Sequence, residues 1–326
     1  MRNINPYISV IIPIYGVEKY IERCVRHLFE QTLDNIEYIF VNDKTQDASI
    51  DILHEIIKEY PNIRKNVIII SHEENKGLPQ ARKTGVAYAT GEYVAHCDSD
   101  DYIDKDMYRQ MYIKAKEENL DMVVCDYYTD TDKTIEYQLI TKPKSKHEII
   151  AQMFMGKFPS YMWNKLVKRN IIQSQDIQWP VDNMWEDMAT MAQIVPKINR
   201  IGYVMNPLYY YVKRENSIVN ARNDKQNVIK KWHQVKNNVE IILKSGIINE
   251  SSDEIIVLKS RARSHLIPLI NDNEIWRIYK NAYPNILISI VKCKLLTIRQ
   301  KISNILYSSF WLHKLAFKIS RYSKSV

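Results

Sequence analysis

The first 127 residues alternate short apolar runs with amphipathic stretches of ten or more residues. The apolar runs are rich in β-branched residues, as in ISVIIPIY, which is typical of a strand buried on both faces. Strands that alternate with helices of this length form βαβ units and predict an α/β fold: a mostly parallel, Rossmann-like sheet with flanking helices. The expected strands are 9–15, 36–42, 66–72, 92–97 and 120–128, and the expected helices are 18–31, 48–60, 78–89 and 104–119.

In such a sheet, ligands bind beyond the carboxyl ends of the strands. We therefore expect a binding site where the predicted strands end, at 13–18, 42–47, 72–77 and 98–101.

The chain changes character after residue 128. Residues 129–220 are rich in Trp, Tyr and Met and contain two strand-like stretches around Pro207. We expect them to add a second wall to the domain that 1–128 begins. Residues 221–326 have helical periodicity and predict a helical C-terminal region.

Positive charge is concentrated at the C-terminal end. The sequence holds 46 Lys and Arg against 38 Asp and Glu, a formal net charge of +8. No acidic residue follows Glu274, whereas ten basic residues do. The body is therefore nearly neutral. This pattern disfavours a nucleic-acid partner bound over the whole protein and favours a tail that meets an anionic surface.

The cationic region also carries an apolar stripe at helical spacing. The stripe consists of Ile288, Val291, Leu295, Ile298, Ile302 and Ile305, and further apolar residues follow at Phe310, Trp311, Leu312, Leu315 and Phe317. Lysines and arginines flank the stripe on both sides. This pattern predicts one helix in a membrane interface, so that 285–326 would meet an anionic membrane surface. A helix packed on the body, or against a coiled-coil partner, is the alternative.

Other features favour the cytoplasm. Four cysteines without a CxxC pair disfavour a disulfide framework or a structural zinc site and favour a reducing compartment. The sequence shows neither a cleavable signal peptide nor a run of about 18 apolar residues. Together with the basic tail, these features predict a cytoplasmic protein peripheral to the inner face of the cell membrane.

The strongest chemical signal is the acidic segment HCDSDDY, residues 96–102. Asp98, Asp100 and Asp101 place three carboxylates within four residues, which is unfavourable unless a cation or hydrogen-bond donors compensate. Mg²⁺ binds through one or two carboxylates together with substrate phosphates. The segment therefore predicts a divalent-cation site at a strand end, although acidic loops without a ligand are common.

Three further positions are candidates for ligand binding. Tyr15, which follows Pro13 at a strand end, could lay its ring against a base or belong to the core. Asp43 could accept a hydrogen bond from a ring N–H such as that of uracil. Arg82 could donate a forked pair of hydrogen bonds to a diphosphate, or pair with a carboxylate such as Asp98.

Taken together, several motifs resemble the inverting family 2 glycosyltransferases with a GT-A fold, which include many enzymes of bacterial capsule, exopolysaccharide and lipopolysaccharide assembly. The motifs, which span residues 7–220, are VIIPIY, FVNDKTQDAS, NKGLPQAR, GEYVAHCDSDDY, WNKLVKR, WED and PLYYYVKRENSI. The resemblance implies transfer of a sugar, here from a UDP-linked donor, to a glycan or polyprenyl-linked acceptor. It also implies a divalent cation, Mn²⁺ or Mg²⁺, as cofactor.

The resemblance assigns roles to residues at the strand tips. It implies a substrate-binding set of Pro13, Tyr15, Asp43, Arg82, Asp98 and Ser99, with Asp100 as the metal ligand. The family's usual Gly after its VDD motif is Lys44 here, and its usual Asn after Tyr is Gly16. These departures bear on loop shape and donor selectivity.

A late acidic pair, Glu186 and Asp187, matches the position of the family's general base. We assign the base to Asp187 and keep Glu186 as the second candidate. Alternatively, the pair caps the following helix or binds Arg214. The aromatic clusters near Trp163 and Tyr209 are expected to form core and acceptor wall, without individual roles.

Two other functions stay open at this point. A sugar nucleotidyltransferase would use a related architecture, but it normally has a glycine-rich loop after the first strand, which PIYGVEKY lacks. A non-enzymatic glycan-binding module would bind without metal-dependent donor hydrolysis.

Overall fold

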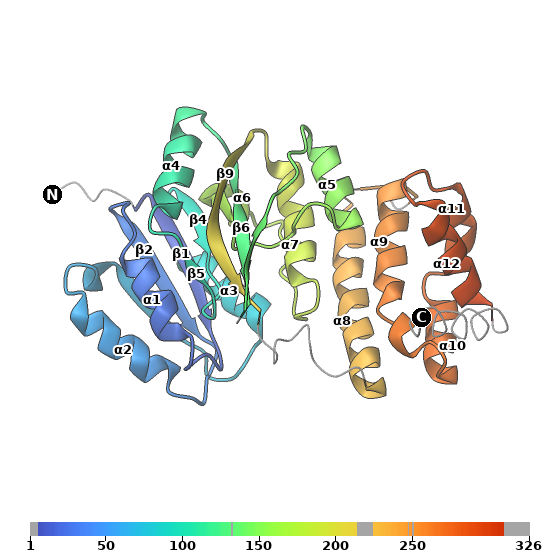
Figure 1. Cartoon of the computed structure of the whole chain (residues 1–326), viewed down its shortest axis with the longest axis horizontal. Coiled ribbons are helices and arrows are strands. Elements are labelled where there is room, and N and C mark those ends of the chain that lie inside the picture. The colour runs from blue at the N-terminus through green and yellow to red at the C-terminus, as the bar shows by residue number, and fades with distance from the viewer. Residues whose placement is uncertain (1–5, 132, 214–223, 247, 250, 310–326) are drawn as a thin grey trace. The chain divides into compact units, whose positions relative to one another are not determined.

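The computed structural model describes residues 6–131, 133–213, 224–246, 248–249 and 251–309 (Figure 1). The chain forms two compact units. Unit 1 comprises residues 1–146 and 159–215, and unit 2 comprises residues 147–158 and 216–326. The segment 129–220, predicted as a second wall of the first domain, thus contributes residues 147–158 to unit 2.

The described strands of unit 1 form one nine-stranded sheet in the order β3-β2-β1-β4-β8-β6-β9-β5, with β7 paired to β6. They are β1 (Ile8–Ile14), β2 (Ile36–Asn42), β3 (Val67–Ser71), β4 (Tyr93–His96), β5 (Tyr102–Ile103), β6 (Met122–Asp130), β7 (Ile135–Gln138), β8 (Lys165–Lys168) and β9 (Ile201–Val212). Six of them run in one direction, and β5, β7 and β8 run in the other. The predicted α/β fold with a mostly parallel sheet is confirmed.

Helices cover both faces of this sheet. Those of unit 1 are α1 (Ile21–Phe29), α2 (Ser49–Glu59), α3 (Leu78–Tyr88), α4 (Met107–Glu117), α6 (Arg169–Ile172) and α7 (Glu186–Ile194), with 3₁₀ turns at Arg64–Asn66 and Val195–Lys197. Successive side chains of β1 point to opposite faces. Val10 and Ile12 join the core cluster that contains residues of α1, α2 and α4. Ile11 faces α3, because a Cβ on Gly85 would lie 2.3 Å from its Cγ2 atom.

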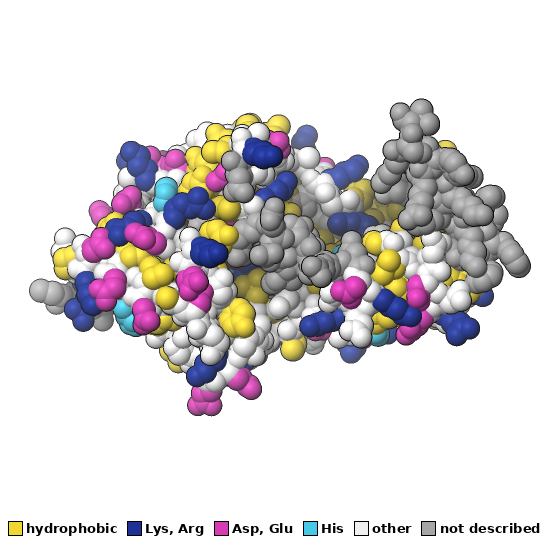
Figure 2. Space-filling view, turned by 60° about the horizontal axis from the view of Figure 1, so that its bottom comes forward, with side chains coloured by type: hydrophobic (Ala, Val, Ile, Leu, Met, Phe, Trp, Pro, Cys, Tyr) yellow, Lys and Arg dark blue, Asp and Glu magenta, His cyan; other side chains and the backbone are white. Residues whose placement is uncertain are grey.

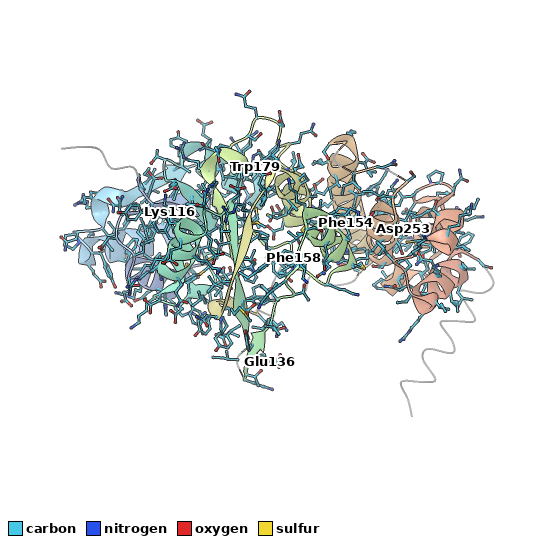
Figure 3. All side chains as sticks on the ribbon, turned by 90° about the horizontal axis from the view of Figure 1, so that it is seen from above. Lys116, Glu136, Phe154, Phe158, Trp179 and Asp253 are labelled. Atoms are coloured by element: carbon cyan, nitrogen blue, oxygen red, sulfur yellow. The ribbon has the colours of Figure 1, made fainter. Side chains whose placement is uncertain are left out.

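The second half of the sheet differs from the simple alternation. The fifth predicted strand, β6, is separated from β4 by β8, which pairs with both in antiparallel fashion. The two strand-like stretches around Pro207 form one strand, β9, whose register against β6 shifts between Cys125 and Tyr127. The β6–β7 hairpin projects from the sheet, with Glu136 near its end (Figure 3).

Unit 2 is helical, as predicted for the C-terminal region. Its described helices are α5 (Lys146–Met155), α8 (Lys225–Lys244), α9 (Asp253–Ser264), α10 (Asn273–Asn281), α11 (Ile286–Lys292) and α12 (Ile298–Ser308), with a 3₁₀ turn at Ile267–Leu269. Arg261 of α9 donates hydrogen bonds to the carbonyls of Met153 and Phe154, which ties α5 to α9. The buried Arg263 donates to Tyr279 and Ser308 and thereby joins α9, α10 and α12.

The predicted single amphipathic helix near the C-terminus is broken into α11 and α12. Thr297 caps α12 through a reciprocal capping box with Gln300, which satisfies backbone donors at a new helix start. Ile288 and Val291 of α11 are exposed, as are Ile298, Ile302 and Ile305 of α12. The further apolar positions at 310–312, 315 and 317 lie outside the described residues. Within the described part of the chain, no helix has the length and hydropathy needed to cross a membrane.

Figure 2 shows acidic and basic side chains interspersed over the visible face of unit 1. This mixture agrees with the nearly neutral body expected from the sequence.

Candidate active site

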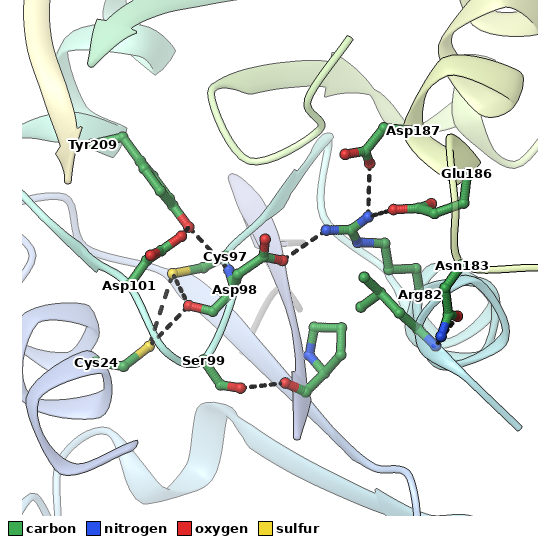
Figure 4. A network of polar contacts seen from close by, with 12 residues as sticks. Cys24, Arg82, Cys97, Asp98, Ser99, Asp101, Asn183, Glu186, Asp187 and Tyr209 are labelled. Atoms are coloured by element: carbon green, nitrogen blue, oxygen red, sulfur yellow. Dashed lines mark hydrogen bonds and ion pairs between the residues drawn. The ribbon is translucent and has the colours of Figure 1, made fainter. Parts of the chain in front are cut away.

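The acidic segment follows β4 and is held in place by β9 (Figure 4). The hydroxyl of Tyr209 accepts a hydrogen bond from the backbone N–H of Asp98 (3.1 Å) and donates one to Asp101 Oδ2 (2.7 Å). The N–H of Val212 donates to Asp101 Oδ1 (2.7 Å). Burial, with Asp100 and Asp98 nearby, raises the pKa of Asp101 well above its usual value. Asp101 therefore anchors the loop rather than facing a ligand.

Arg82 connects the acidic segment to the late acidic pair. Its Nη2 atom lies 2.7 Å from Asp98 Oδ1, and its Nη1 atom contacts both Glu186 Oε1 and Asp187 Oδ1, the latter at 2.7 Å. The Arg82 side chain is 1% exposed. Burial favours its neutral form, but the three carboxylates outweigh burial and raise the pKa of Arg82. Asp98, the partner suggested by the sequence, is therefore one of three carboxylates that Arg82 contacts.

The two acids of the late pair have different environments. Both lie in the first turn of α7, after Trp185, which adopts a left-handed conformation with φ of 64°. Glu186 is buried, and its burial raises its pKa well above the usual value. The side chain of Asp187 is 20% exposed, so this carboxylate is accessible from the surface.

The residues at the end of β4 fit a divalent cation that is completed by substrate phosphates. Burial raises the pKa of Asp98, Arg82 lowers it and the neighbouring Asp100 raises it again, so added positive charge is favourable there. Asp100 is partly exposed at the loop. Within the described residues, no group of three or more His, Cys, Asp or Glu side chains could hold a metal alone. A site of one or two carboxylates plus phosphates is the mode that Mg²⁺ favours.

The tips of β1 and β2 lie next to this loop. The hydroxyl of Ser99 donates to the carbonyl of Pro13 (2.7 Å), so both predicted binding residues are engaged with each other. Tyr15 is 56% exposed at the end of β1, which suits stacking against a base. The N–H of Gly16 donates to Thr45 Oγ1 (2.9 Å), which ties the two strand tips together.

Asp43 belongs to a separate polar network. Its carboxylate accepts from the backbone N–H groups of Lys76 and Gly77, both at 2.8 Å, and lies 2.7 Å from His72 Nδ1. It is buried, so it fixes the loop before α3. The next residue, Lys44, has φ of 60°, the left-handed conformation that explains why the family uses Gly there.

Sequence reasoning gave no individual role to two residues that build this site, although it placed their clusters in the core and acceptor wall. One is Tyr209, whose hydroxyl organises the acidic segment. The other is Lys165, buried on β8, whose Nζ atom donates to the carbonyls of Pro159 and Tyr161 and to Asn164 Oδ1. Both occur in motifs that carry the family resemblance, WNKLVKR and PLYYYVKRENSI, and their place in those motifs was the available signal.

The family model described as glycosyl transferase family 2 matches residues 9–174. Among curated proteins, the chain is 35% identical over 223 residues to the putative glycosyltransferase EpsH of Bacillus subtilis (strain 168). That match covers 66% of this chain and 63% of the relative's length.

Solved structures share the fold. The structure of S. aureus TarS 1-349 in complex with UDP-GlcNAc has a TM-score of 0.66 at 19% identity, covering 92% of this chain and 90% of that one. The mannosyltransferase PcManGT from Pyrobaculum calidifontis, in complex with GDP-Man and Mn²⁺, has a TM-score of 0.54 at 15% identity, covering 98% and 81%. The GT-A fold expected from the motifs is therefore confirmed. Because the family model spans half of the sequence, this chain belongs to glycosyl transferase family 2.

Proposed function

We propose that the chain transfers a sugar from a nucleotide-diphosphate donor to an acceptor hydroxyl, with inversion at the anomeric carbon. The observation that carries this proposal is the position of Arg82, which lies 2.7 Å from Asp98 on the donor side and 2.7 Å from Asp187 on the acceptor side. One guanidinium thus brings the cation-binding loop and the candidate base to the same place.

On the donor side, the exposed ring of Tyr15 is proposed to stack on the base. The β1 and β2 tips around Pro13 and Asp43 would hold the nucleotide, and Asp98 would face its sugar. The buried Asp43, whose carboxylate holds the loop before α3, would position that loop beside the nucleotide. UDP is the proposed nucleotide. The structural neighbour solved with UDP-GlcNAc supports this choice.

Asp100 is the proposed ligand of a divalent cation, with Asp98 beside it. Bound Mn²⁺ or Mg²⁺ would stabilise the negative charge that develops on the departing diphosphate. The crowded carboxylates support this assignment, as does the neighbour solved with Mn²⁺.

Asp187 is the proposed general base. A sugar hydroxyl is a poor nucleophile near neutral pH, so a carboxylate must accept its proton as it attacks. Both carboxylates contact Arg82 Nη1, but the side chain of Asp187 is partly exposed, whereas that of Glu186 is buried. A single in-line displacement needs one base and no covalent intermediate, and it inverts the anomeric centre.

A thermal-shift panel of UDP-, GDP-, CMP- and TDP-sugars, each with and without Mn²⁺, tests the donor and the cation. We expect one nucleotide class, UDP, to raise the melting temperature, and only with the metal. Asp100→Asn is expected to abolish the metal-dependent rise in melting temperature, whereas Asp51→Asn on α2 should leave that rise unchanged. Stabilisation by no nucleotide sugar would contradict the proposal and favour a glycan-binding module. Release of pyrophosphate from a sugar phosphate and UTP would favour a nucleotidyltransferase.

We further propose that unit 2 binds the inner face of the cell membrane, where a polyprenyl-linked acceptor for surface polysaccharide would lie. The exposed isoleucines and valine of α11 and α12 supply apolar area. Lys292, Lys294, Arg299 and Lys301 supply positive charge without an intervening acid. Cations beside an exposed apolar face suit an anionic lipid interface.

Sedimentation with lipid vesicles tests this surface. We expect binding to phosphatidylglycerol vesicles, weaker binding in high salt, and little binding to phosphatidylcholine alone. The double variant Ile298→Ser with Ile302→Ser should weaken binding roughly tenfold or more, since it removes two large side chains from the lipid contact. Ile113→Ser, an exposed isoleucine of α4, is the matched control. Equal binding by the double variant would refute the assignment.

A further inference from the structure

Four aromatic rings from two separate segments lie parallel beside the proposed active site. Trp163 stacks on Tyr209 with a centroid distance of 4.2 Å and an interplanar angle of 16°. It is also parallel to Tyr161, at 4.8 Å and 11°, and to Tyr211, at 5.9 Å and 5°. Tyr161 and Tyr211 are themselves parallel, at 6.4 Å and 12°. We call these four residues the aromatic stack.

The members of the stack differ in burial. Trp163 and Tyr209 are buried and belong to the core of unit 1. Tyr211 is partly buried, and Tyr161 is 40% exposed. The stack therefore rises from the core to the surface, with Tyr161 at its outer end.

One side of the stack is fixed to the acidic segment, residues 96–102. Tyr209 bonds both Asp98 and Asp101, as described above, and Val212 bonds Asp101. Tyr211 lies between these two anchors on β9, and burial raises the pKa of its phenol, to which the nearby carboxylates of Asp101, Asp100 and Asp98 add. The ring of Tyr211 is thus near the place where the donor's diphosphate would lie.

The other side of the stack is fixed near the candidate base. The carbonyl of Tyr161 accepts from Lys165 Nζ at 2.6 Å. Burial lowers the pKa of Lys165 to about 7, and Asp187 acts in the opposite direction because its carboxylate is close. Tyr161 is therefore joined through Lys165 to the side of the site that contains Asp187.

We propose that Tyr161 and Tyr211 form a platform on which a pyranose ring of the acceptor lies. This inference rests on the proposed function and assigns the acceptor to a class, a carbohydrate with an apolar C–H face. The aromatic rings would orient that sugar so that one hydroxyl faces Asp187. Stacking also excludes water from the reacting hydroxyl.

A second row of stacked tyrosines is separate from the platform. Tyr102, Tyr210 and Tyr128 stack on the other face of β6 and β9, with centroid distances of 4.4 and 4.9 Å. The guanidinium of Arg23 covers the ring of Tyr102 at 4.2 Å. Because alternate residues of a strand point to opposite faces, this row points away from Tyr209 and Tyr211.

Saturation-transfer NMR with methyl glycosides of glucose, galactose and N-acetylglucosamine tests the platform directly. At least one glycoside should bind the full-length protein, with the strongest transfer to its axial C–H protons. Tyr161→Ala should weaken that binding roughly three- to tenfold, while Tyr161→Phe should retain it, because the ring face and not the hydroxyl makes the contact. Tyr88→Ala, an exposed tyrosine at the far end of α3, is the control.

Kinetics separate this proposal from the proposed function. In the transfer reaction, Tyr161→Ala should raise KM for the glycoside with little change in kcat, and hydrolysis of the nucleotide sugar without acceptor should be unchanged. Wild-type binding of no glycoside, or equal binding by Tyr161→Ala, would overturn the platform. Absence of nucleotide-sugar turnover with any donor, together with glycoside binding that Tyr161→Ala weakens, would overturn the transferase function and leave the platform intact.

Discussion

Asp187→Asn is expected to lower the rate of sugar transfer by roughly 10²–10⁴, because the amide cannot accept the proton of the acceptor hydroxyl. Donor binding should persist, since Asp187 lies on the acceptor side of Arg82. The amide keeps the size of the carboxylate and one oxygen for Arg82 Nη1, so the melting temperature should change little. The measurements are kcat for transfer and the donor-induced thermal shift, both in the presence of Mn²⁺.

Two further variants sharpen this result. Asp176→Asn alters an exposed carboxylate that pairs with Lys197, and it should leave the rate unchanged. Glu186→Gln removes a buried carboxyl group next to Arg82 and should affect stability more than Asp187→Asn does. Normal turnover by Asp187→Asn, with loss of turnover by Glu186→Gln, would move the base to Glu186.

The first half of the sheet was predictable because its signal is local. Each of β1, β2 and β3 is a run of apolar, β-branched residues, and each is followed by a helix that leads to the next parallel strand of the sheet. The place of β8 was not predictable in this way. It has four residues, Lys165–Lys168, and it enters the sheet between β4 and β6 through pairing that its own sequence does not encode.

The acidic residues of the site could also be predicted from short motifs, but their contact through one arginine could not. Asp98 follows a strand and Asp187 lies in the first turn of a helix, and nothing in either motif shows that one arginine contacts both. Arg82 contacts Asp187 across 105 positions of the chain. Such a pairing arises from the order of strands in the sheet, so only the fold reveals that Arg82 is buried among carboxylates.

The C-terminal stripe shows the opposite error, in which a local pattern was extended too far. Apolar residues continue at helical spacing from Ile288 to Ile305, yet the chain leaves the helix after Lys292. The signal for the new start was present as Thr297 and Gln300, the spacing of a capping box. Periodicity records which face is apolar, whereas the cap decides where a helix begins.

Arg82→Met is expected to be the most destabilising of the substitutions considered. It leaves Asp98, Glu186 and Asp187 facing one another without the guanidinium, and loss of one partner from a buried ion network costs about 3–5 kcal/mol. For a chain of this size, that corresponds to a fall in melting temperature of roughly 10 °C. Transfer activity should be lost as well, because Asp187 loses the group that orients it.

The pH dependence of the stability of Arg82→Met tests whether the unpaired carboxylates cause the loss. Burial and neighbouring acids raise the pKa values of Asp98 and Glu186, and Arg82 opposes this rise. Without Arg82, the contribution of these two groups to stability is present at low pH and is lost as pH rises through their folded-state pKa values. The deficit of Arg82→Met relative to wild type should therefore be smaller at about pH 5 than at about pH 8. Adding Glu186→Gln to Arg82→Met should recover part of the loss, since it removes one of the unpaired charges.

Arg26→Met is the matched control, because Arg26 also contacts two carboxylates, Glu22 and Glu59, but at the surface, where such pairs contribute less than about 1 kcal/mol. A deficit of Arg82→Met no larger than that of Arg26→Met, or one that does not vary with pH, would show that the three carboxylates do not depend on this arginine.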